Sequence, residues 1–235
     1  MRGKAMRKMF GLIAALTLAG CLSTAVKQDP PANPQTAADY TAQGRQLALK
    51  KETQGRAIES FKRAQELATS DDERAEALKG LGEIYFIIAR DNDALKCYSD
   101  ALRLRPGDPG ARTMLGATLT SIENYNAALK ELNAVIEKNP SYPDAYAWRG
   151  LVHHRRKLWG KAILDFQQAL LMELPKPLRI RTCADLADAY VKTGQYQQAL
   201  DTWQEMIRLE PRMNTPEVRR YMELARTAQK AQNGS

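Results

Sequence analysis

The stretch PGARTMLGATLTSIENYNAALKELNAVIEKNPSY, residues 109–142, decides the fold of this 235-residue chain. Its large apolar residues recur at helical spacing in both halves, which predicts two helices joined by a short turn. Gly116 and Ala128 are small enough to let these two helices cross closely. Pro140 closes the second helix, because proline has no amide hydrogen and disfavours helix in the residue before it. The stretch therefore predicts a helix–turn–helix unit of 34 residues.

The same unit recurs along the chain, as the prolines at the ends of successive second helices show. Pro106 and Pro140 are 34 residues apart. We expect units at 75–108, 109–142, 143–179 and 180–213, with a short insertion near 177–179. The small residues at the predicted helix crossings are Gly82, Gly116, Gly150 and Ala187 on the first helices and Ala94, Ala128, Ala162 and Ala199 on the second. Each unit would expose an apolar face that only its neighbour can cover, so the units should stack.

Further helices are predicted on both sides of these four units. Residues 37–74 fit a degenerate fifth unit, with Gly44 at the crossing and one extra residue in the turn. Residues 214–235 should form a capping helix that begins at Thr215-Pro216 and has a polar outer face, followed by a frayed tail. The fold class expected from the residues alone is all-α.

The period and the small residues resemble those of the tetratricopeptide repeat family. This resemblance implies an α-solenoid of four to five repeats with a C-terminal capping helix, in which the first helices line a concave channel that binds proteins or peptides. By their register, the candidate groove residues are Lys79, Glu83, Phe86, Thr113, Ala117, Thr120, Ala147, Leu151, His154, Arg155, Arg181, Asp188 and Val191.

Two features of the predicted groove bear on its ligand. One branch of the family binds C-terminal carboxylates with a clamp of Lys and Asn. Lys79 stands at one clamp position, but Glu83 replaces the Asn, which argues against such a clamp. Arg149, Arg155 and Arg156 form a basic cluster that we would test with an acidic peptide.

The N-terminus predicts export and lipid attachment. Residues 1–20 carry four basic and no acidic residues, and an apolar run over 9–18 is too short to span a membrane. The run ends in Leu18-Ala19-Gly20-Cys21, which resembles a bacterial lipobox and implies a lipid on Cys21 after signal-peptide cleavage. Residues 21–36 contain three prolines and predict a disordered tether. Leu22 rather than Asp after the cysteine favours the outer membrane, facing the periplasm.

No catalytic, cofactor or metal site is predicted. His153 and His154 are adjacent, so on a helix their rings point about 100° apart and cannot share a metal ion. Cys97 and Cys183 lie three repeats apart, too far for a disulfide, and should be buried thiols. The net charge of +8 includes the four basic residues of the signal peptide, and the remaining cations are scattered among acids, so nucleic acid is not an expected partner.

The function predicted from these features is a scaffold. The chain should hold envelope proteins or peptides at the outer membrane, with pilus or secretion-system biogenesis as the favoured role by resemblance to small repeat lipoproteins of those systems. Two alternatives stay open: an adaptor for peptidoglycan hydrolases or proteases, and a structural protein that self-associates through its terminal helix. The second would gain support if Val218, Tyr221 and Met222 were exposed.

Overall fold

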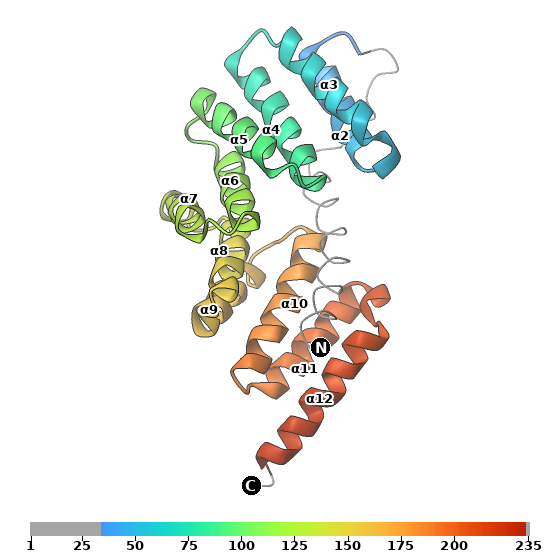
Figure 1. Cartoon of the computed structure of the whole chain (residues 1–235), viewed down its shortest axis with the longest axis vertical. Coiled ribbons are helices and arrows are strands. Elements are labelled where there is room, and N and C mark those ends of the chain that lie inside the picture. Colours follow the sequence, from blue (N-terminus) through green and yellow to red (C-terminus); the bar gives the residue numbers. More distant parts are fainter. Residues whose placement is uncertain (1–33, 234–235) are drawn as a thin grey trace. The chain divides into compact units, whose positions relative to one another are not determined.

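The computed structural model describes residues 34–233, and this part of the chain consists of α-helices, two short 3-10 helices and the turns between them (Figure 1). The predicted signal peptide, Cys21 and residues 22–33 of the predicted tether lie outside the described residues. No strand occurs between residues 34 and 233. The predicted all-α repeat fold is confirmed. The helices divide between two compact units, which meet in the sequence at residues 140 and 141.

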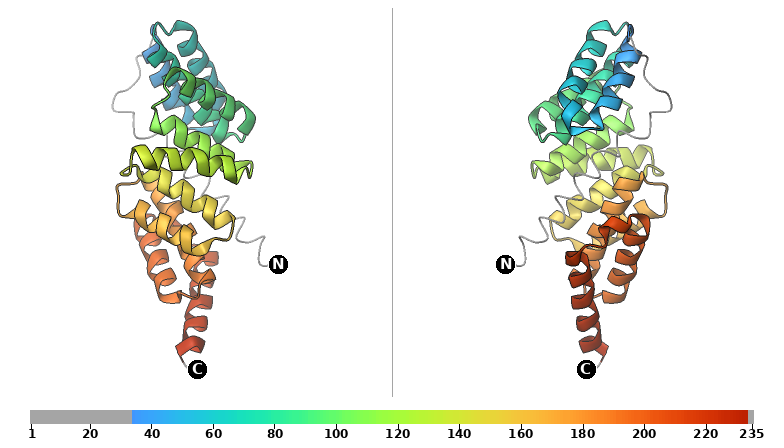
Figure 2. Two further views of the ribbon diagram at one scale, coloured as in Figure 1. Left: turned by 90° about the vertical axis from the view of Figure 1, so that its left-hand side faces the viewer. Right: turned by 90° about the vertical axis from the view of Figure 1, so that its right-hand side faces the viewer.

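The N-terminal unit, residues 34–140, is a stack of three helical hairpins, seen from its two sides in Figure 2. Its elements are α2 (Ala37–Ala48), η2 (Lys51–Thr53), α3 (Gln54–Leu67), α4 (Asp71–Ile87), α5 (Asp91–Leu104), α6 (Pro109–Ser121) and α7 (Tyr125–Lys138). Helix α4 packs against its own partner α5 and against the preceding hairpin, and it also touches α6. The three first helices α2, α4 and α6 are therefore neighbours.

The C-terminal unit, residues 141–233, contains two hairpins and a final helix. Its elements are α8 (Pro143–Arg155), α9 (Trp159–Leu170), α10 (Lys176–Lys192), α11 (Tyr196–Leu209), η3 (Pro211–Met213) and α12 (Pro216–Asn233). Helix α10 packs against α8, α9 and α11, and α12 packs against α11. Each hairpin thus covers an apolar side of the next one, as a repeat array requires.

Polar side chains begin several first helices by accepting hydrogen bonds from the first turn, whose amides lack a partner within the helix. The Ser70 hydroxyl accepts from the Glu73 amide at 3.2 Å, and the Asp108 carboxylate accepts from the Ala111 amide at 2.9 Å. The predicted Thr215 cap of the last helix also forms, with its hydroxyl 3.3 Å from the Val218 amide.

The glycines at the helix crossings have no room for a side chain. A Cβ atom on Gly116 would lie 2.8 Å from Cγ of Leu132, and one on Gly150 would lie 2.6 Å from Cδ1 of Phe166. Gly80 adds a crossing that the repeat register did not predict, since a Cβ atom there would lie 2.2 Å from Phe61 of the preceding hairpin. Close approach, rather than a left-handed backbone, explains these glycines.

Three segments bear on the predicted boundaries. Helix α4 begins at Asp71, where three successive acids suit the start of a helix, and α10 begins at Lys176. Residues 177–179, the predicted short insertion, lie in the first turn of α10, because proline suits the first turn of a helix, where its missing amide has no partner to lose. The expected frayed tail is also shorter, since α12 continues to Asn233.

The two described cysteines are buried free thiols, as predicted. Burial raises the pKa of Cys97 to about 11 and that of Cys183 to about 12. Both thiols therefore stay protonated at neutral pH and are poor nucleophiles. Between residues 34 and 233, none of the helices combines the length and the apolar character that crossing a membrane requires.

Candidate functional site

The first-helix face of the N-terminal unit is the surface formed by α2, α4 and α6 at the register of Arg45, Glu83 and Ala117. Each of these residues directly follows the glycine at its helix crossing. Ala117 is fully buried, whereas Arg45 and Glu83 are half-buried and present charge on this face. The face therefore combines a small buried residue on α6 with charged residues on α2 and α4.

A network of ion pairs surrounds Glu76 on this face. The Arg45 guanidinium lies 2.8 Å from the Glu76 carboxylate, and Arg105 reaches the same carboxylate at 2.7 Å. Lys79 Nζ lies 3.1 Å from Glu76 and 3.1 Å from Asp108. Asp108 also caps α6, so the network connects α2, α4 and the start of α6. Burial opposes ionisation of both acids, but Lys79 and Arg45 keep the pKa of Glu76 below its usual range, and the Ala111 amide together with Lys79 keeps that of Asp108 low.

Glu83, one turn after Lys79, has neither a hydrogen bond nor an ion pair with any described residue. Burial raises the pKa of Glu83 to about 7, although Arg45 and Lys79 nearby oppose this rise. A desolvated carboxylate without a partner is unfavourable when it is ionised. Glu83 is thus about half protonated near neutral pH, which is unusual for a glutamate.

The other predicted groove residues of the N-terminal unit differ in accessibility. Phe86 is half-buried and packs against the core around Tyr85. Thr113 and Thr120 are buried. The Thr120 hydroxyl donates to the Gly116 carbonyl oxygen at 2.7 Å, while the Thr113 hydroxyl oxygen has no hydrogen-bond partner among the described residues. Lys79, Glu83 and Phe86 on α4 therefore offer the reachable surface of the predicted set in this unit.

In the C-terminal unit, two adjacent histidines contact different acids. His154 Nε2 lies 2.8 Å from Oδ2 of Asp188 and so connects α8 to α10. His153 Nε2 lies 3.6 Å from Asp165 on α9. The two rings thus point to different helices, as the spacing predicted. Between residues 34 and 233 there is no group of three His, Cys, Asp or Glu residues that could hold a metal ion.

One member of the proposed basic cluster, Arg149, is neutralised by an acid. Arg149 makes two hydrogen bonds to Asp165, at 3.0 and 2.7 Å, so its charge is already compensated. A bidentate guanidinium–carboxylate pair of this kind is among the stronger ionic contacts. Only Arg155 and Arg156 of the cluster are exposed, which weakens the case for an acidic ligand here.

The remaining predicted residues on α8 and α10 are mostly inside the protein. Ala147, Leu151 and Asp188 are buried. Arg181 is half-buried, with its guanidinium 4.7 Å from the centre of the Trp148 ring and 3.6 Å from Asp185. Val191 is half-buried on α10. Of the groove residues predicted in this unit, only Arg155, Arg181 and Val191 have side chains that are at least partly exposed to solvent.

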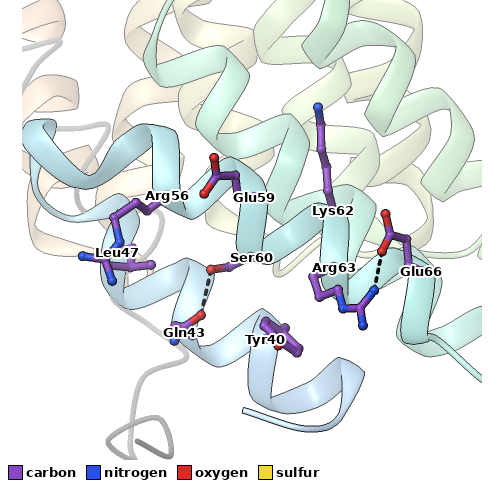
Figure 3. A pocket seen from close by; sticks show the side chains of 9 residues that line it. All are labelled: Tyr40, Gln43, Leu47, Arg56, Glu59, Ser60, Lys62, Arg63 and Glu66. Atoms are coloured by element: carbon purple, nitrogen blue, oxygen red, sulfur yellow. Dashed lines mark hydrogen bonds and ion pairs between the residues drawn. The ribbon is translucent and has the colours of Figure 1, made fainter. Parts of the chain in front are cut away.

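A cavity of about 480 Å³ lies between α2 and α3, at the end of the N-terminal unit where the described chain begins (Figure 3). Its lining is mixed in charge and partly paired, since Ser60 donates to Gln43 at 2.8 Å and Arg63 lies 2.8 Å from Glu66. In the next hairpin the matching first-helix residues are buried apolar side chains. The cavity therefore lies at the first hairpin of the described stack, with polar residues suited to water.

Part of the charge network could be recognised from local sequence signals. Asp108 before Pro109 is a recognisable helix start. Arg45 occupies the same register position as Glu83 in the degenerate unit. Nothing local predicts Arg105, because its partner Glu76 is 29 residues away in the sequence.

Comparison with known proteins agrees with this architecture. A family model described as TPR repeat matches residues 116–156. One chain of the APC/C hetero-tetramer Cut9–Hcn1 is 21% identical with a TM-score of 0.74, and the match covers 94% of this chain and 42% of that chain. This protein therefore spans less than half of that relative.

Two further solved structures match over most of their own length. A thermophilic TPR protein from Thermus thermophilus is 21% identical with a TM-score of 0.66, covering 81% of this chain and 98% of that chain. YrrB, described as a TPR protein with an unusual peptide-binding site, is 22% identical with a TM-score of 0.52, covering 83% of this chain and 92% of that chain. At these identities the likeness concerns the fold. The chain thus contains a region that matches a TPR repeat model, and its helices have the fold of tetratricopeptide repeat solenoids.

Proposed function

We propose that this protein is an outer-membrane lipoprotein that holds envelope proteins on its first-helix faces during assembly of a pilus or secretion system. The repeat fold is that of a protein–protein interaction scaffold. The first-helix face around Glu83 carries the proposal of a binding surface, since it presents reachable charged and aromatic side chains on α4. YrrB, which has a similar fold, is described as having a peptide-binding site.

The sequence supports the place of action. Leu18-Ala19-Gly20-Cys21 has the residues of a lipobox, and a lipid on Cys21 would hold the chain at the membrane. Up to about 15 tether residues could place the repeats up to ~50 Å from the bilayer. The pilus or secretion role rests on the resemblance of this layout (signal, tether, repeat array) to lipoproteins of those systems.

Site-specific photo-crosslinking in native envelopes tests the proposal. A photoreactive phenylalanine analogue at Phe86 samples the first-helix face, and the same analogue at Lys130 samples the exposed side of α7 as a matched control. We expect protein adducts from Phe86 and not from Lys130, with pilus or secretion components among them. Adducts with peptidoglycan hydrolases would favour the adaptor alternative, and a lack of any protein adduct from Phe86 would contradict the scaffold function.

The self-association alternative loses its structural argument. Val218 and Met222 are buried against α11 of the same chain, and Tyr221 stacks on Trp203 with ring centres 6.4 Å apart. The apolar stripe of α12 is therefore already covered, and it offers no free surface to a second copy.

A further inference from the structure

The charges on the first-helix face of the N-terminal unit are unequally satisfied. Arg45, Lys79 and Arg105 each contact at least one acid, and Lys79 contacts two. Glu83 is half-buried beside them without an ion pair to any described residue. On this face the three cations are therefore paired with acids, whereas the carboxylate of Glu83 has no cationic partner among the described residues.

The unpaired carboxylate of Glu83 indicates which kind of ligand would complement this face. A carboxylate removed from water is stabilised by a cation that donates hydrogen bonds to it. Neither Arg45 nor Lys79 forms an ion pair with Glu83, since Arg45 donates to Glu76 and Lys79 donates to Glu76 and Asp108. A cation that pairs with Glu83 would therefore come from outside this network.

We propose that Glu83 binds a lysine or arginine side chain of the partner, so that the N-terminal unit selects basic segments. The inference rests on the proposed scaffold function and names the ligand class of its first-helix face. Phe86, one turn further along α4, offers an aromatic surface beside the carboxylate. An extended basic side chain could pack its methylene groups there while its charge meets Glu83.

An acidic ligand fits this face poorly. A ligand carboxylate would have to displace Glu76 or Asp108 from Lys79, and it would then lie close to Glu83. Both steps are unfavourable, because like charges repel and an abandoned half-buried acid loses its partner. This arrangement is a physical argument against a carboxylate clamp at Lys79.

The proposal predicts a particular dependence on pH. The charged groups facing Glu83 are Arg45 from α2, Glu76 and Lys79 from α4, and Asp108 before α6. The two acids among them have lowered pKa values, so neither titrates between pH 6 and pH 8. Glu83, with a pKa of about 7, changes from about one-tenth to about nine-tenths ionised over that range. Affinity for a basic segment should therefore rise about tenfold from pH 6 to pH 8.

The experiment uses the segment that the Phe86 photo-crosslinker captures in native envelopes. Mass spectrometry identifies the segment, and a fluorescent synthetic copy is titrated with the full lipidated protein, purified in detergent, at pH 6, 7 and 8. Glu83→Gln should lose about tenfold in affinity at pH 8 and bind with little pH dependence. A copy of the segment with its lysine or arginine replaced by glutamine should lose a similar factor with the wild-type protein.

Matched measurements separate binding from folding. Glu137→Gln, an equally conservative change on the exposed side of α7, should bind like the wild type. The raised pKa of Glu83 means that the folded state retains a proton that the unfolded chain releases above pH 4.5, so stability falls as pH rises towards about 7. Glu83→Gln removes this loss, and its melting temperature should exceed the wild-type value at pH 8 but not at pH 5.

Each outcome bears on one statement. A captured segment without a basic residue, or unchanged affinity in Glu83→Gln, overturns the inference and leaves the scaffold function standing. Absence of any protein adduct from Phe86 overturns the scaffold function and the inference with it. A basic segment that binds more weakly at pH 6 and to Glu83→Gln supports both.

Discussion

At the scale of single residues, the close packing of the helices depends on glycines, which have no side chain to keep two helices apart. The Phe61 ring is fully buried between two glycines, Gly44 of its own hairpin and Gly80 of the next. Gly44 belongs to the recurring crossing slot. Gly80 does not, and its role emerges only when α3 packs against α4. Both positions are needed because an aromatic ring fills the space that a Cβ atom would occupy.

Gly80→Ala should therefore destabilise the protein by about 1–3 kcal/mol through overpacking against Phe61. Gly55→Ala is the matched control, because Gly55 is also helical and a Cβ atom there meets nothing within 4 Å. The control should gain up to about 1 kcal/mol from higher helix propensity. Thermal and urea unfolding followed by circular dichroism measure both effects, and equal stability of the two variants would refute the packing argument.

At the scale of the element, α12 ends the C-terminal unit by covering the last hairpin. Val218, Met222 and Ala225 are buried on its inner side. The outer side carries exposed arginines together with Leu224, which is 57% exposed. The helical spacing of the apolar residues predicted this inner stripe, and its start at Thr215 was also predictable from the capping residues. A capping helix of this kind protects the apolar side of α11 from water.

Val218→Asp should consequently lower the free energy of unfolding by at least about 2 kcal/mol, because it places a carboxylate in a fully buried position. Leu224→Asp makes the same chemical change on the exposed side of the same helix and should shift stability by no more than about 0.5 kcal/mol. Chemical unfolding and size-exclusion chromatography compare the two variants. Comparable losses in both would mean that α12 does not cap the unit through its inner stripe.

At the scale of the whole molecule, the proposed function requires both attachment and binding. The proposal assigns binding to the repeats and attachment to a lipid on Cys21. If Cys21 carries the lipid, then Cys21→Ala should abolish fatty-acid labelling and release the protein from membranes, since the remaining chain would have lost its acyl chains. Cys97→Ala is the control, because Cys97 is a buried thiol within α5 and should not affect labelling. Persistent labelling of Cys21→Ala would contradict the lipobox interpretation.

The sequence by itself determined the helices, their pairing and their order. Helical spacing, capping residues and small residues at crossings are local properties, and repetition made them recognisable. Only the tertiary structure decided which charges remain available. Lys79 is occupied by Glu76 and Asp108, Arg149 is occupied by Asp165, and Glu83 is left without a partner among the described residues. Ion pairing depends on the distances between side chains of different helices. The repeat pattern in the sequence predicts which position of a helix each residue occupies, but it does not give those distances.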